Sequence, residues 1–354
     1  MTGRPPVDPA IAHPLRVAQV VCTDLFAGVE RYVATLATGL GRAGHQVVVL
    51  GGQRGSMTDT LGAEPVTWMP AANVPAATRA LLAAHPFDVV HVHMTAAELA
   101  GTLASLRHRA PLVSTRHFAE TRGSSAPARA VGHLVGRRIA AQLAISEYVA
   151  DRIEGPSVVV SPGTPTVPVR PSSREREPVV LVAQRLETEK RTDLALGAWA
   201  ASGLAADGWE LHLAGDGAER GALEELAARL GVVDSCRFLG RRSDITECYL
   251  TASMLLAPRS DEPFGLSVVE AMAAGLPVVA GAGGGHDATV GACPAARLFP
   301  AGDVTRAGEL LASLAADPAG RDRYGEALAA VQAERFSAEA QVAATLDVYR
   351  SVLA

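Results

Sequence analysis

"MLLAPRSDEPFGLSVVEAMAAGLPVVAG" (residues 254–281) contains a strand, a helix and a second strand in succession. Residues 254–258 form a short apolar run bounded by polar residues, which is typical of a strand covered on both faces of a parallel sheet. Residues 265–275 continue as a helix that ends at a glycine, and 277–281 is another apolar run. A strand, a crossover helix and a parallel strand make one βαβ unit.

The same alternation extends over most of the chain and predicts an α/β protein built on parallel sheets. Strands are expected at 16–21, 45–50, 87–93, 111–115, 141–146, 179–184, 209–215 and 236–240. Helices are expected at 28–44, from about residue 192, at 218–231 and over most of the last fifty residues.

A proline-rich stretch without periodicity, residues 161–178, interrupts this alternation and is the best linker candidate. It divides the chain into a first domain, 1–165, and a second, 166–335. A C-terminal helix, 336–354, follows and is expected to pack back towards the first domain. Two α/β domains imply a cleft between them. Ligands of open α/β sheets bind beyond the carboxyl ends of the strands, so candidate chemistry is expected in the loops that follow strands.

The composition excludes several classes of protein. The chain has 354 residues, 48% of them hydrophobic, and a net charge of −5, which argues against a general nucleic-acid binder. No apolar run approaches the roughly 20 residues of a membrane helix, and the N-terminus lacks a signal-peptide core, so we expect a cytoplasmic protein. The cysteines have no CxxC spacing and are interpreted as reduced thiols: Cys22, Cys236, Cys248 and Cys293.

One segment is basic although the net charge of the chain is negative. Seven arginines lie between Arg107 and Arg138, with Glu120 as the only acidic residue among them. The simplest interpretation, which we favour, is a solvated face. A surface for an anionic acceptor, or a peripheral contact with an anionic membrane, stays open as the alternative.

Two carboxylates stand out around the helix of the opening stretch. Glu262 lies in the loop before the helix, and Glu270 lies inside it, eight residues later. Gly265 stands at the helix start, where free N–H groups favour anionic or hydroxyl-rich ligands. Glu270 is flanked by apolar residues, and a buried carboxylate is costly without a partner. The alternative is a helix-stabilising acid and a surface glutamate.

Two cations follow the strand 179–184. They are Arg185 and Lys190, and Lys190 is the only lysine among the 32 Lys and Arg residues. A planar guanidinium and a compact ammonium near a helix start can grip a diphosphate. The alternative is an exposed loop that Glu187 and Glu189 neutralise, and these residues alone leave both interpretations open.

Three further loops after strands carry weaker signals. Gly28 opens a helix after the first strand, but without the GxGxxG pattern of a dinucleotide-binding dehydrogenase. His117 lies just past a strand end, toward the expected cleft, although a lone histidine is more often structural. The glycine run within 281–291 permits close backbone approach to a ligand, and His286 follows it.

Together these residues resemble the retaining glycosyltransferases of family 4. The E-x7-E motif formed by Glu262 and Glu270 lies within "EPFGLSVVEAMAAGLPVV", and "RLETEK" (185–190), "LAGDG" (213–217) and "AGVER" (27–31) extend the match. The resemblance runs in order from Arg16 to about Phe336. It implies the GT-B fold, in which two Rossmann-like parallel-sheet domains face a cleft.

The resemblance also implies roles for single residues. Arg185 and Lys190 would hold the diphosphate of a nucleotide sugar, Glu270 the ribose and Glu262 hydroxyls of the donor sugar. Backbone N–H groups assist near Phe264, Gly265 and Leu266. In the first domain, Gly28 would lie close to the diphosphate and His117 at the reacting centre. The predicted catalytic residues are therefore His117, Glu262, Arg185 and Lys190.

The activity implied is retaining transfer of a sugar from a nucleotide sugar, UDP- or GDP-linked, to an acceptor hydroxyl of a small molecule, lipid or glycan. No DxD motif follows a strand, so we expect no metal and no cofactor, and the fixed cations would stabilise the leaving diphosphate. A nucleotide-sugar epimerase of the same fold and a non-catalytic nucleotide-sugar-binding protein are the alternatives. Gln184, Arg191 and the His286–Asp287 pair depart from the family pattern and leave the donor open.

Overall fold

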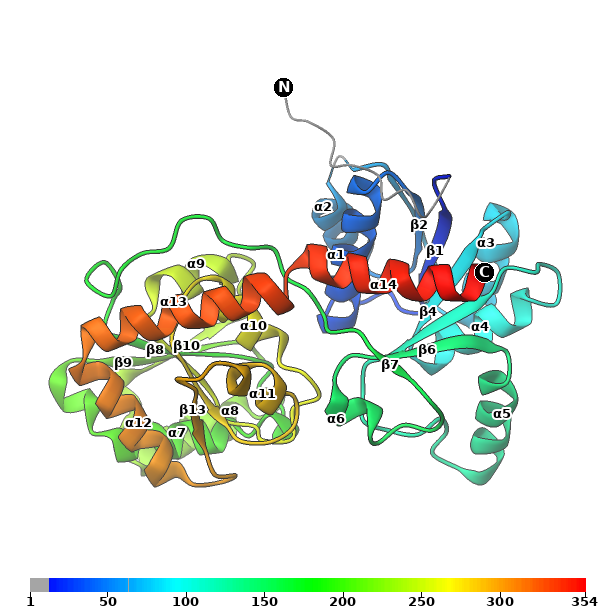
Figure 1. The fold of residues 1–354 in the computed structure, drawn as a ribbon. Helices are drawn as coiled ribbons and strands as arrows, with labels where there is room; N and C mark the ends of the chain where they lie inside the picture. The colour runs from blue at the N-terminus through cyan, green and yellow to red at the C-terminus, as the bar shows by residue number, and fades with distance from the viewer. Residues whose placement is uncertain (1–12, 63) are drawn as a thin grey trace. The chain divides into compact units, whose positions relative to one another are not determined.

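The computed structural model describes residues 13–62 and 64–354 (Figure 1). The N-terminal stretch 1–12, on which the signal-peptide argument partly rests, lies outside them. The chain divides into two compact units. The first ends at Gly163 and also takes Ala338–Ala354, and the second is Thr164–Ser337. Each contains one parallel sheet with helices, so the predicted α/β class with two Rossmann-like domains is confirmed.

The sheet of the first unit has the strand order β3-β2-β1-β4-β5-β6-β7. Its strands are β1 (Arg16–Val21), β2 (Gln46–Leu50), β3 (Val66–Met69), β4 (Val89–His93), β5 (Leu112–Arg116), β6 (Ile139–Ala144) and β7 (Val158–Val159). Its helices are α1 (Gly28–Arg42), α2 (Arg54–Leu61), α3 (Val74–Ala84), α4 (Met94–Ala104), α5 (Ala126–Gly136), α6 (Glu147–Ala150) and α14 (Ala338–Leu353).

The sheet of the second unit has the order β10-β9-β8-β11-β12-β13. Its strands are β8 (Val179–Ala183), β9 (Glu210–Ala214), β10 (Cys236–Gly240), β11 (Met254–Ala257), β12 (Val278–Gly281) and β13 (Arg297–Phe299). Its α-helices are α7 (Thr192–Ser202), α8 (Arg220–Arg229), α9 (Ile245–Thr251), α10 (Leu266–Ala273), α11 (Gly285–Ala288), α12 (Val304–Ala316) and α13 (Pro318–Arg335).

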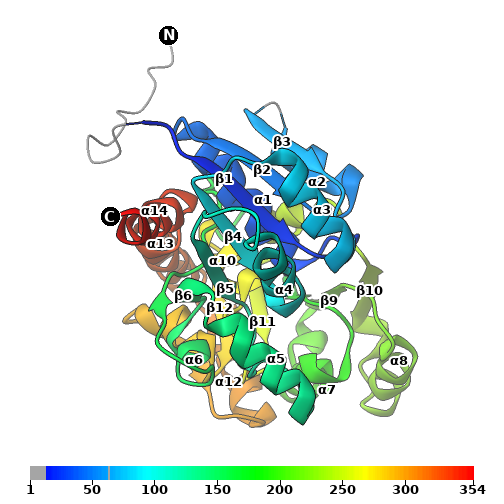
Figure 2. The same cartoon turned by 90° about the vertical axis from the view of Figure 1, so that its right-hand side faces the viewer.

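The two faces of the first sheet differ in chemistry. On one face Val20, Val92 and Leu112 join an apolar core with residues of α3 and α4, and Figure 2 shows α3 beside β2 and β3. Because side chains alternate along a strand, Gln19 and His91 point to the other face. That face is covered by α1 and α14, which contact each other. It buries polar side chains instead of a purely apolar layer.

Some elements escaped prediction because they are short or weakly patterned. Helix α2 buries only Met57 and Leu61 of its eight residues, so its sequence lacks a helical apolar stripe. Strands β7 and β13 have two and three residues, and helix α9 has seven. Elements of this length carry too few residues to establish a period.

The proline-rich stretch 161–178 behaves differently from a free linker. It contains neither a helix nor a strand, but from residue 164 onward it belongs to the second unit. Arg176 is 8% exposed and donates to the carbonyls of Tyr249, Ala252 and Ala274. The backbone N–H of Ser173 donates to Asp322 at 2.7 Å. Buried guanidinium bonds to helix-end carbonyls therefore hold this segment in place.

The last helix is built into the first unit. Within α14, the Gln341 amide oxygen accepts from the backbone N–H of Gly163, and Tyr349 is fully buried. Gly39 of α1 faces Val342 so closely that a Cβ there would lie 2.4 Å from its Cγ2. None of the helices in residues 13–62 and 64–354 is both long and apolar enough to cross a bilayer.

Candidate active site

The loop after β8 folds into a compact turn that presents Lys190. The turn is a 3₁₀ segment, Thr188–Lys190. The Gln184 amide donates to the carbonyl of Lys190 and to Thr192 Oγ1, both at 2.9 Å. Gln184, which departs from the family pattern, therefore holds the end of the turn and the start of α7. Gly215 lies against the same loop, where a Cβ would meet the Gln184 carbonyl at 1.8 Å.

Lys190 and Glu262 form the central contact of the second unit. The ammonium Nζ lies 2.7 Å and 3.0 Å from the two carboxylate oxygens of Glu262. Their side chains are 17% and 18% exposed, so the pair is largely shielded from water. Arg259, which the sequence did not suggest, lies 3.7 Å from the same carboxylate. The carboxyl ends of β8 and β11 thus bring together a carboxylate and two cations.

Arg185 is placed differently from its predicted partner. Its side chain is 61% exposed and forms an ion pair with Glu189 at 2.8 Å. The two cations that were predicted to bind one diphosphate thus have different partners in this structure. Lys190 contacts Glu262, whereas Glu189 neutralises Arg185 at the surface, as the alternative interpretation predicted. An exposed ion pair of this kind contributes at most about 1 kcal/mol, so little free energy opposes its rearrangement.

The start of α10 is packed against the glycine loop after β12. Gly265 has a φ of +92°, and Phe264 is buried with its ring 5.8 Å from that of Phe336. The backbone N–H of Gly285 donates to the Glu262 carbonyl at 2.6 Å. A Cβ on Gly265 would lie 3.2 Å from the His286 ring. The loops that carry Glu262 and His286 therefore support each other.

His286 lies inside this cluster with a defined proton position. It is 2% exposed, and burial lowers its pKa, so the ring is neutral at neutral pH. Its Nδ1 lies 3.0 Å from the carbonyl oxygen of Gly281, which can only accept a hydrogen bond. Nδ1 therefore carries the proton, and Nε2 holds a lone pair on the side of Gly265.

Glu270 has the partner that a shielded carboxylate needs. Tyr249, which is 2% exposed, donates its hydroxyl to Glu270 Oε2 at 3.0 Å. Leu266 is the first residue of the same helix and is half-buried. Glu262 and Glu270 therefore lie before and within one helix, as the spacing predicted, with different partners.

In the first unit, Gly28 and His117 both follow strands but differ in exposure. Gly28 is the first residue of α1 and is exposed, and the preceding backbone N–H, of Ala27, donates to Glu30. His117 is 6% exposed, and its Nε2 lies 3.2 Å from His93 Nδ1. Burial lowers the pKa of His117 to about 3. It is held by a partner within its own unit.

Sequence reasoning missed the polar partners of His117. Gln19 and His91 pair in register across β1 and β4, and His93 pairs with Thr115. All four side chains are fully buried. The available signal was the alternation "HVH" (91–93) inside an otherwise apolar strand, which places two imidazoles on the same face.

The arginine-rich segment splits into buried and exposed members. Arg116 and Arg122 are buried, and Arg122 donates to Glu98, Glu154 and Gln142. The solvated-face interpretation is therefore wrong for these two residues, because acids outside the segment pair with them. The other five arginines are exposed: Arg107, Arg109, Arg129, Arg137 and Arg138.

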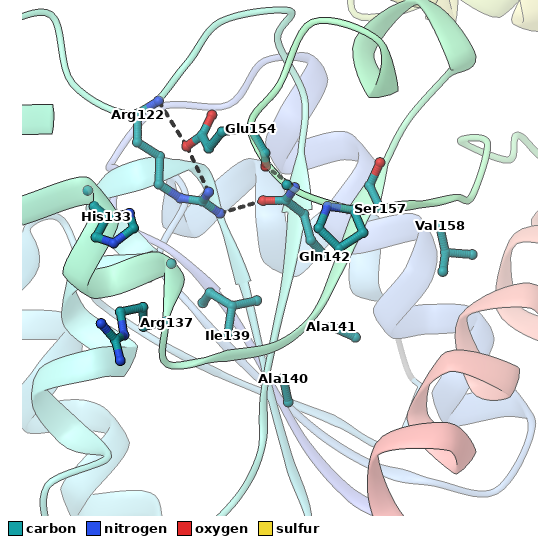
Figure 3. Close-up of a pocket in the computed structure, with 14 residues that line it drawn as sticks. Arg122, His133, Arg137, Ile139, Ala140, Ala141, Gln142, Glu154, Ser157 and Val158 are labelled. Carbon is teal, nitrogen blue, oxygen red and sulfur yellow. Dashed lines mark hydrogen bonds and ion pairs between the residues drawn. The ribbon is translucent and has the colours of Figure 1, made fainter.

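A pocket of about 570 Å³ lies in the same region, between α5 and the strands β6 and β7 (Figure 3). Figure 3 shows Arg122 bonded to Glu154 and Gln142, with His133 of α5 and Arg137, the residue after α5, nearby. None of the predicted site residues lines it. The pocket is therefore separate from the candidate site.

The part of the chain that the structure describes contains no group of three or more His, Cys, Asp or Glu side chains arranged to hold a metal ion. The four cysteines are free thiols, and burial raises the pKa of Cys22 and of Cys236 to about 11.

Two protein families match successive parts of this chain. Residues 26–166 match "Glycosyltransferase Family 4", and residues 165–330 match "Glycosyl transferases group 1". A D-inositol 3-phosphate glycosyltransferase of Streptomyces avermitilis is 30% identical over 75% of this chain and 66% of its own length. One of Kribbella flavida is 30% identical over 75% of this chain and 71% of its own. The chain thus spans about two thirds of the length of these relatives.

Solved structures agree on the fold. Anabaena Alr3699/HepE, crystallised with UDP and glucose, superposes on this chain with a TM-score of 0.78 and is 20% identical in sequence. The alignment covers 95% of this chain and 100% of the Anabaena chain. AviGT4, a glycosyltransferase of avilamycin A biosynthesis, has a TM-score of 0.71 and is 19% identical in sequence. That alignment covers 96% of this chain and 98% of AviGT4. These identities establish the shared GT-B fold alone. Because two family matches divide the chain and relatives align along most of their length, the chain belongs to the family 4 glycosyltransferases.

Proposed function

We propose that this chain transfers a sugar from a nucleotide sugar to an acceptor hydroxyl, with retention of anomeric configuration and without a metal ion. The observation that carries the proposal is the shielded pair of Lys190 and Glu262 beside the start of α10. A cation for phosphate and a carboxylate for hydroxyls are the two groups that a nucleotide sugar needs. Because structural neighbours were crystallised with UDP and with UDP-glucose, we propose a UDP-sugar as the donor, with a GDP-sugar as the alternative.

Lys190 and Arg185 are proposed to bind the diphosphate. When the sugar departs, negative charge develops on the leaving diphosphate, and a fixed ammonium stabilises it without needing a metal. Lys190 is held in position by the turn that Gln184 pins. Arg185 would exchange its exposed contact with Glu189 for a phosphate oxygen. Arg259 adds positive charge beside Glu262.

Glu262 and Glu270 are proposed to bind the hydroxyl groups of the donor. Glu262 now accepts from Lys190 and would accept from sugar hydroxyls when the phosphate engages the ammonium. The backbone N–H groups near Phe264, Gly265 and Leu266, at the start of the same helix, would donate to the donor. Glu270, oriented by Tyr249, would accept from the ribose hydroxyls.

The proposed reaction takes place on one face of the sugar. The bond between the anomeric carbon and the phosphate oxygen breaks, and a bond to the acceptor oxygen forms on the same face. The acceptor hydroxyl proton passes to the departing phosphate oxygen, so no external base is consumed. His117 would accept a hydrogen bond from a substrate hydroxyl in the first unit.

The names of the relatives suggest the acceptor. Several are D-inositol 3-phosphate glycosyltransferases, and we propose a phosphorylated polyol as the acceptor of this chain. The exposed arginines of the segment 107–138 would attract such an anion. A lipid in an anionic membrane surface and a glycan are the other acceptors that the test includes.

The test combines donor binding with product analysis. UDP-, GDP- and dTDP-sugars are screened by thermal shift, because a ligand at 100 times its Kd adds about 2.7 kcal/mol to stability. The donor that stabilises the protein is then incubated with inositol phosphate, a glycan or anionic vesicles, in EDTA. The expected result is α-linked product from an α-linked donor. Isomerised donor without acceptor would indicate an epimerase, and binding without turnover a non-catalytic protein. No stabilisation by any nucleotide sugar would refute the proposal.

A further inference from the structure

A continuous chain of buried polar groups runs beneath α14 in the first unit. It begins at Tyr349 of α14, whose hydroxyl lies 2.9 Å from Gln19 Nε2 and 2.7 Å from His91 Nδ1. The Gln19 Oε1 lies 2.8 Å from His93 Nε2, and His93 Nδ1 lies 3.2 Å from His117 Nε2. The last helix of the chain is thereby connected to the predicted catalytic histidine.

The amide of Gln19 gives this chain of hydrogen bonds a direction. Its Nε2 can only donate, and it donates to Tyr349, so its Oε1 accepts from His93. The proton of His93 therefore lies on Nε2. Burial holds the pKa of His93 well below neutrality, so the ring is neutral and its Nδ1 is a bare lone pair. That lone pair accepts from His117, whose proton must lie on Nε2.

The remaining nitrogen of His117 is left as an acceptor. The pKa of His117 is lowered to about 3, mainly by burial, so the ring is neutral at neutral pH. With the proton on Nε2, the Nδ1 of His117 carries a lone pair. The hydrogen bond that His117 forms within the described part of the first unit uses Nε2, not Nδ1. Tyr32 packs edge-on against the same ring, with centroids 4.8 Å apart, and restricts its rotation.

We infer that Tyr349 is a positioning residue which sets the tautomer of His117 through Gln19 and His93. His117 then presents Nδ1 as a hydrogen-bond acceptor to a substrate hydroxyl at the carboxyl edge of the first sheet. The catalytic part of this inference rests on the proposed function, whereas the tautomer does not. His117 therefore has this tautomer only when α14 is packed on the first sheet and Tyr349 is in place.

The second arm of the network stabilises the same arrangement. Because Tyr349 receives a hydrogen bond from Gln19, its own proton is free to go to His91 Nδ1. His91 then donates from Nε2 to Thr115 Oγ1 at 2.7 Å. Tyr349 thus anchors both branches. Loss of its hydroxyl would leave the Gln19 amide without an acceptor, and rotation of that amide by half a turn would reverse the direction of the chain.

The direct test observes the proton. The full chain is labelled with ¹⁵N-histidine, and two-bond ¹H–¹⁵N spectra at neutral pH distinguish protonated from bare ring nitrogens. His117 is assigned by comparison with His117→Gln. The expected result is a neutral ring protonated on Nε2. A wild-type spectrum with the proton of His117 on Nδ1 would overturn the inference, whether or not the protein has transferase activity.

Variants then test the role of Tyr349. Tyr349→Phe is expected to give His117 a mixed tautomer signal, whereas Tyr324→Phe, which changes a buried tyrosine of the second unit, is expected to leave it unchanged. If Tyr349→Phe does not fold, Gln19→Met removes the same connection. An unaltered His117 signal in a folded Tyr349→Phe or Gln19→Met variant would refute the connection.

Kinetics separate this inference from the proposed function. With a donor and acceptor identified, Tyr349→Phe is expected to lower kcat by about tenfold or more, because a wrong tautomer cannot accept the substrate hydrogen bond. KM for the donor should stay within about twofold, since Lys190, Glu262 and Glu270, which are proposed to bind the donor, lie in the second unit. A wild-type kcat with a mixed tautomer would refute the catalytic role. If the spectra show His117 protonated on Nε2 but no sugar is transferred, the result would count against the proposed function and not against the tautomer.

Discussion

Lys190 illustrates how one residue can be singled out by composition and then given a partner by the fold. It is the only lysine of the chain, which uses arginine for every other cation of this kind. Its partner Glu262 lies 72 residues away. The turn positions the compact ammonium of Lys190 so that it contacts both carboxylate oxygens of Glu262. A guanidinium is planar and holds its donors in a rigid fork, so it would place the positive charge differently from an ammonium.

Lys190→Arg is therefore expected to be non-conservative. The variant should remain folded but lose at least about tenfold in kcat/KM for the donor, because the displaced charge no longer meets the phosphate. Steady-state kinetics with the donor from the thermal-shift screen measures this loss. Arg229→Lys, an exposed exchange with only a 3.9 Å contact to Glu225, is the matched control and should leave kcat/KM unchanged. Equal kinetics for Lys190→Arg and wild type would contradict the diphosphate role.

Arg191, the neighbouring departure from the family pattern, has a backbone explanation. Its φ of +53° and ψ of +41° lie in the left-handed region, which glycine adopts without cost. The side chain forms two hydrogen bonds with Asp193, which offset part of the strain. Arg191 thus adopts a backbone conformation that glycine adopts more readily than any other residue.

At the scale of elements, the loop after β11 and the loop after β12 form one packed unit. Gly285 lies so close to Phe264 that a Cβ there would be 2.3 Å from the Phe264 Cα, and its N–H bonds to Glu262. The glycine run was expected to allow close approach of a ligand. The structure gives it an additional role, which is close approach to the loop that carries Glu262.

Gly285→Ala is expected to move the Glu262 loop. Because the contact is with backbone rather than with a flexible side chain, the variant should lose about 1–3 kcal/mol of stability and bind the donor more weakly. Urea unfolding and donor titration measure the two effects. Gly221→Ala in α8, where a Cβ would meet nothing within 4 Å, should instead keep or raise stability. An unchanged donor affinity in Gly285→Ala would disprove the coupling of the two loops.

At the scale of the whole molecule, the buried histidines make the first unit sensitive to acid. The pKa values of His91 and His117 are lowered to about 3, and that of His93 is well below its usual value, mainly by burial. Below a pH of about 6.5 these residues bind protons in the unfolded chain but not in the folded one. Stability must therefore fall as the pH falls from about 6.5 toward 3, by up to about 1.4 kcal/mol per pH unit for each histidine.

Tryptophan fluorescence can locate this loss. Trp68 lies in the first unit, whereas Trp199 and Trp209 lie in the second. In a Trp199→Phe/Trp209→Phe variant, the urea midpoint is expected to fall clearly between pH 7.5 and 5.5. In a Trp68→Phe variant it should fall less, because among the described residues of the second unit His286 is the histidine whose pKa is lowered. A first-unit midpoint that is constant over this range would contradict the buried, neutral state of the histidines.

The sequence by itself determined the parts of this protein that depend on local pattern. Apolar runs bounded by turns predicted the main strands, and the segment 254–281 with its E-x7-E spacing predicted both the βαβ unit and the family. Glu262 and Glu270 could be placed before and within one helix because helical spacing is a property of neighbouring residues.

Tertiary structure decided which side chains meet. It paired Lys190 with Glu262 and left Arg185 with Glu189, withdrew Arg116 and Arg122 from the surface, and connected Tyr349 to His117. These contacts depend on strand register and helix docking between segments far apart in the chain. The free energy of such pairs comes from burial and shared hydrogen bonds, which no local pattern records.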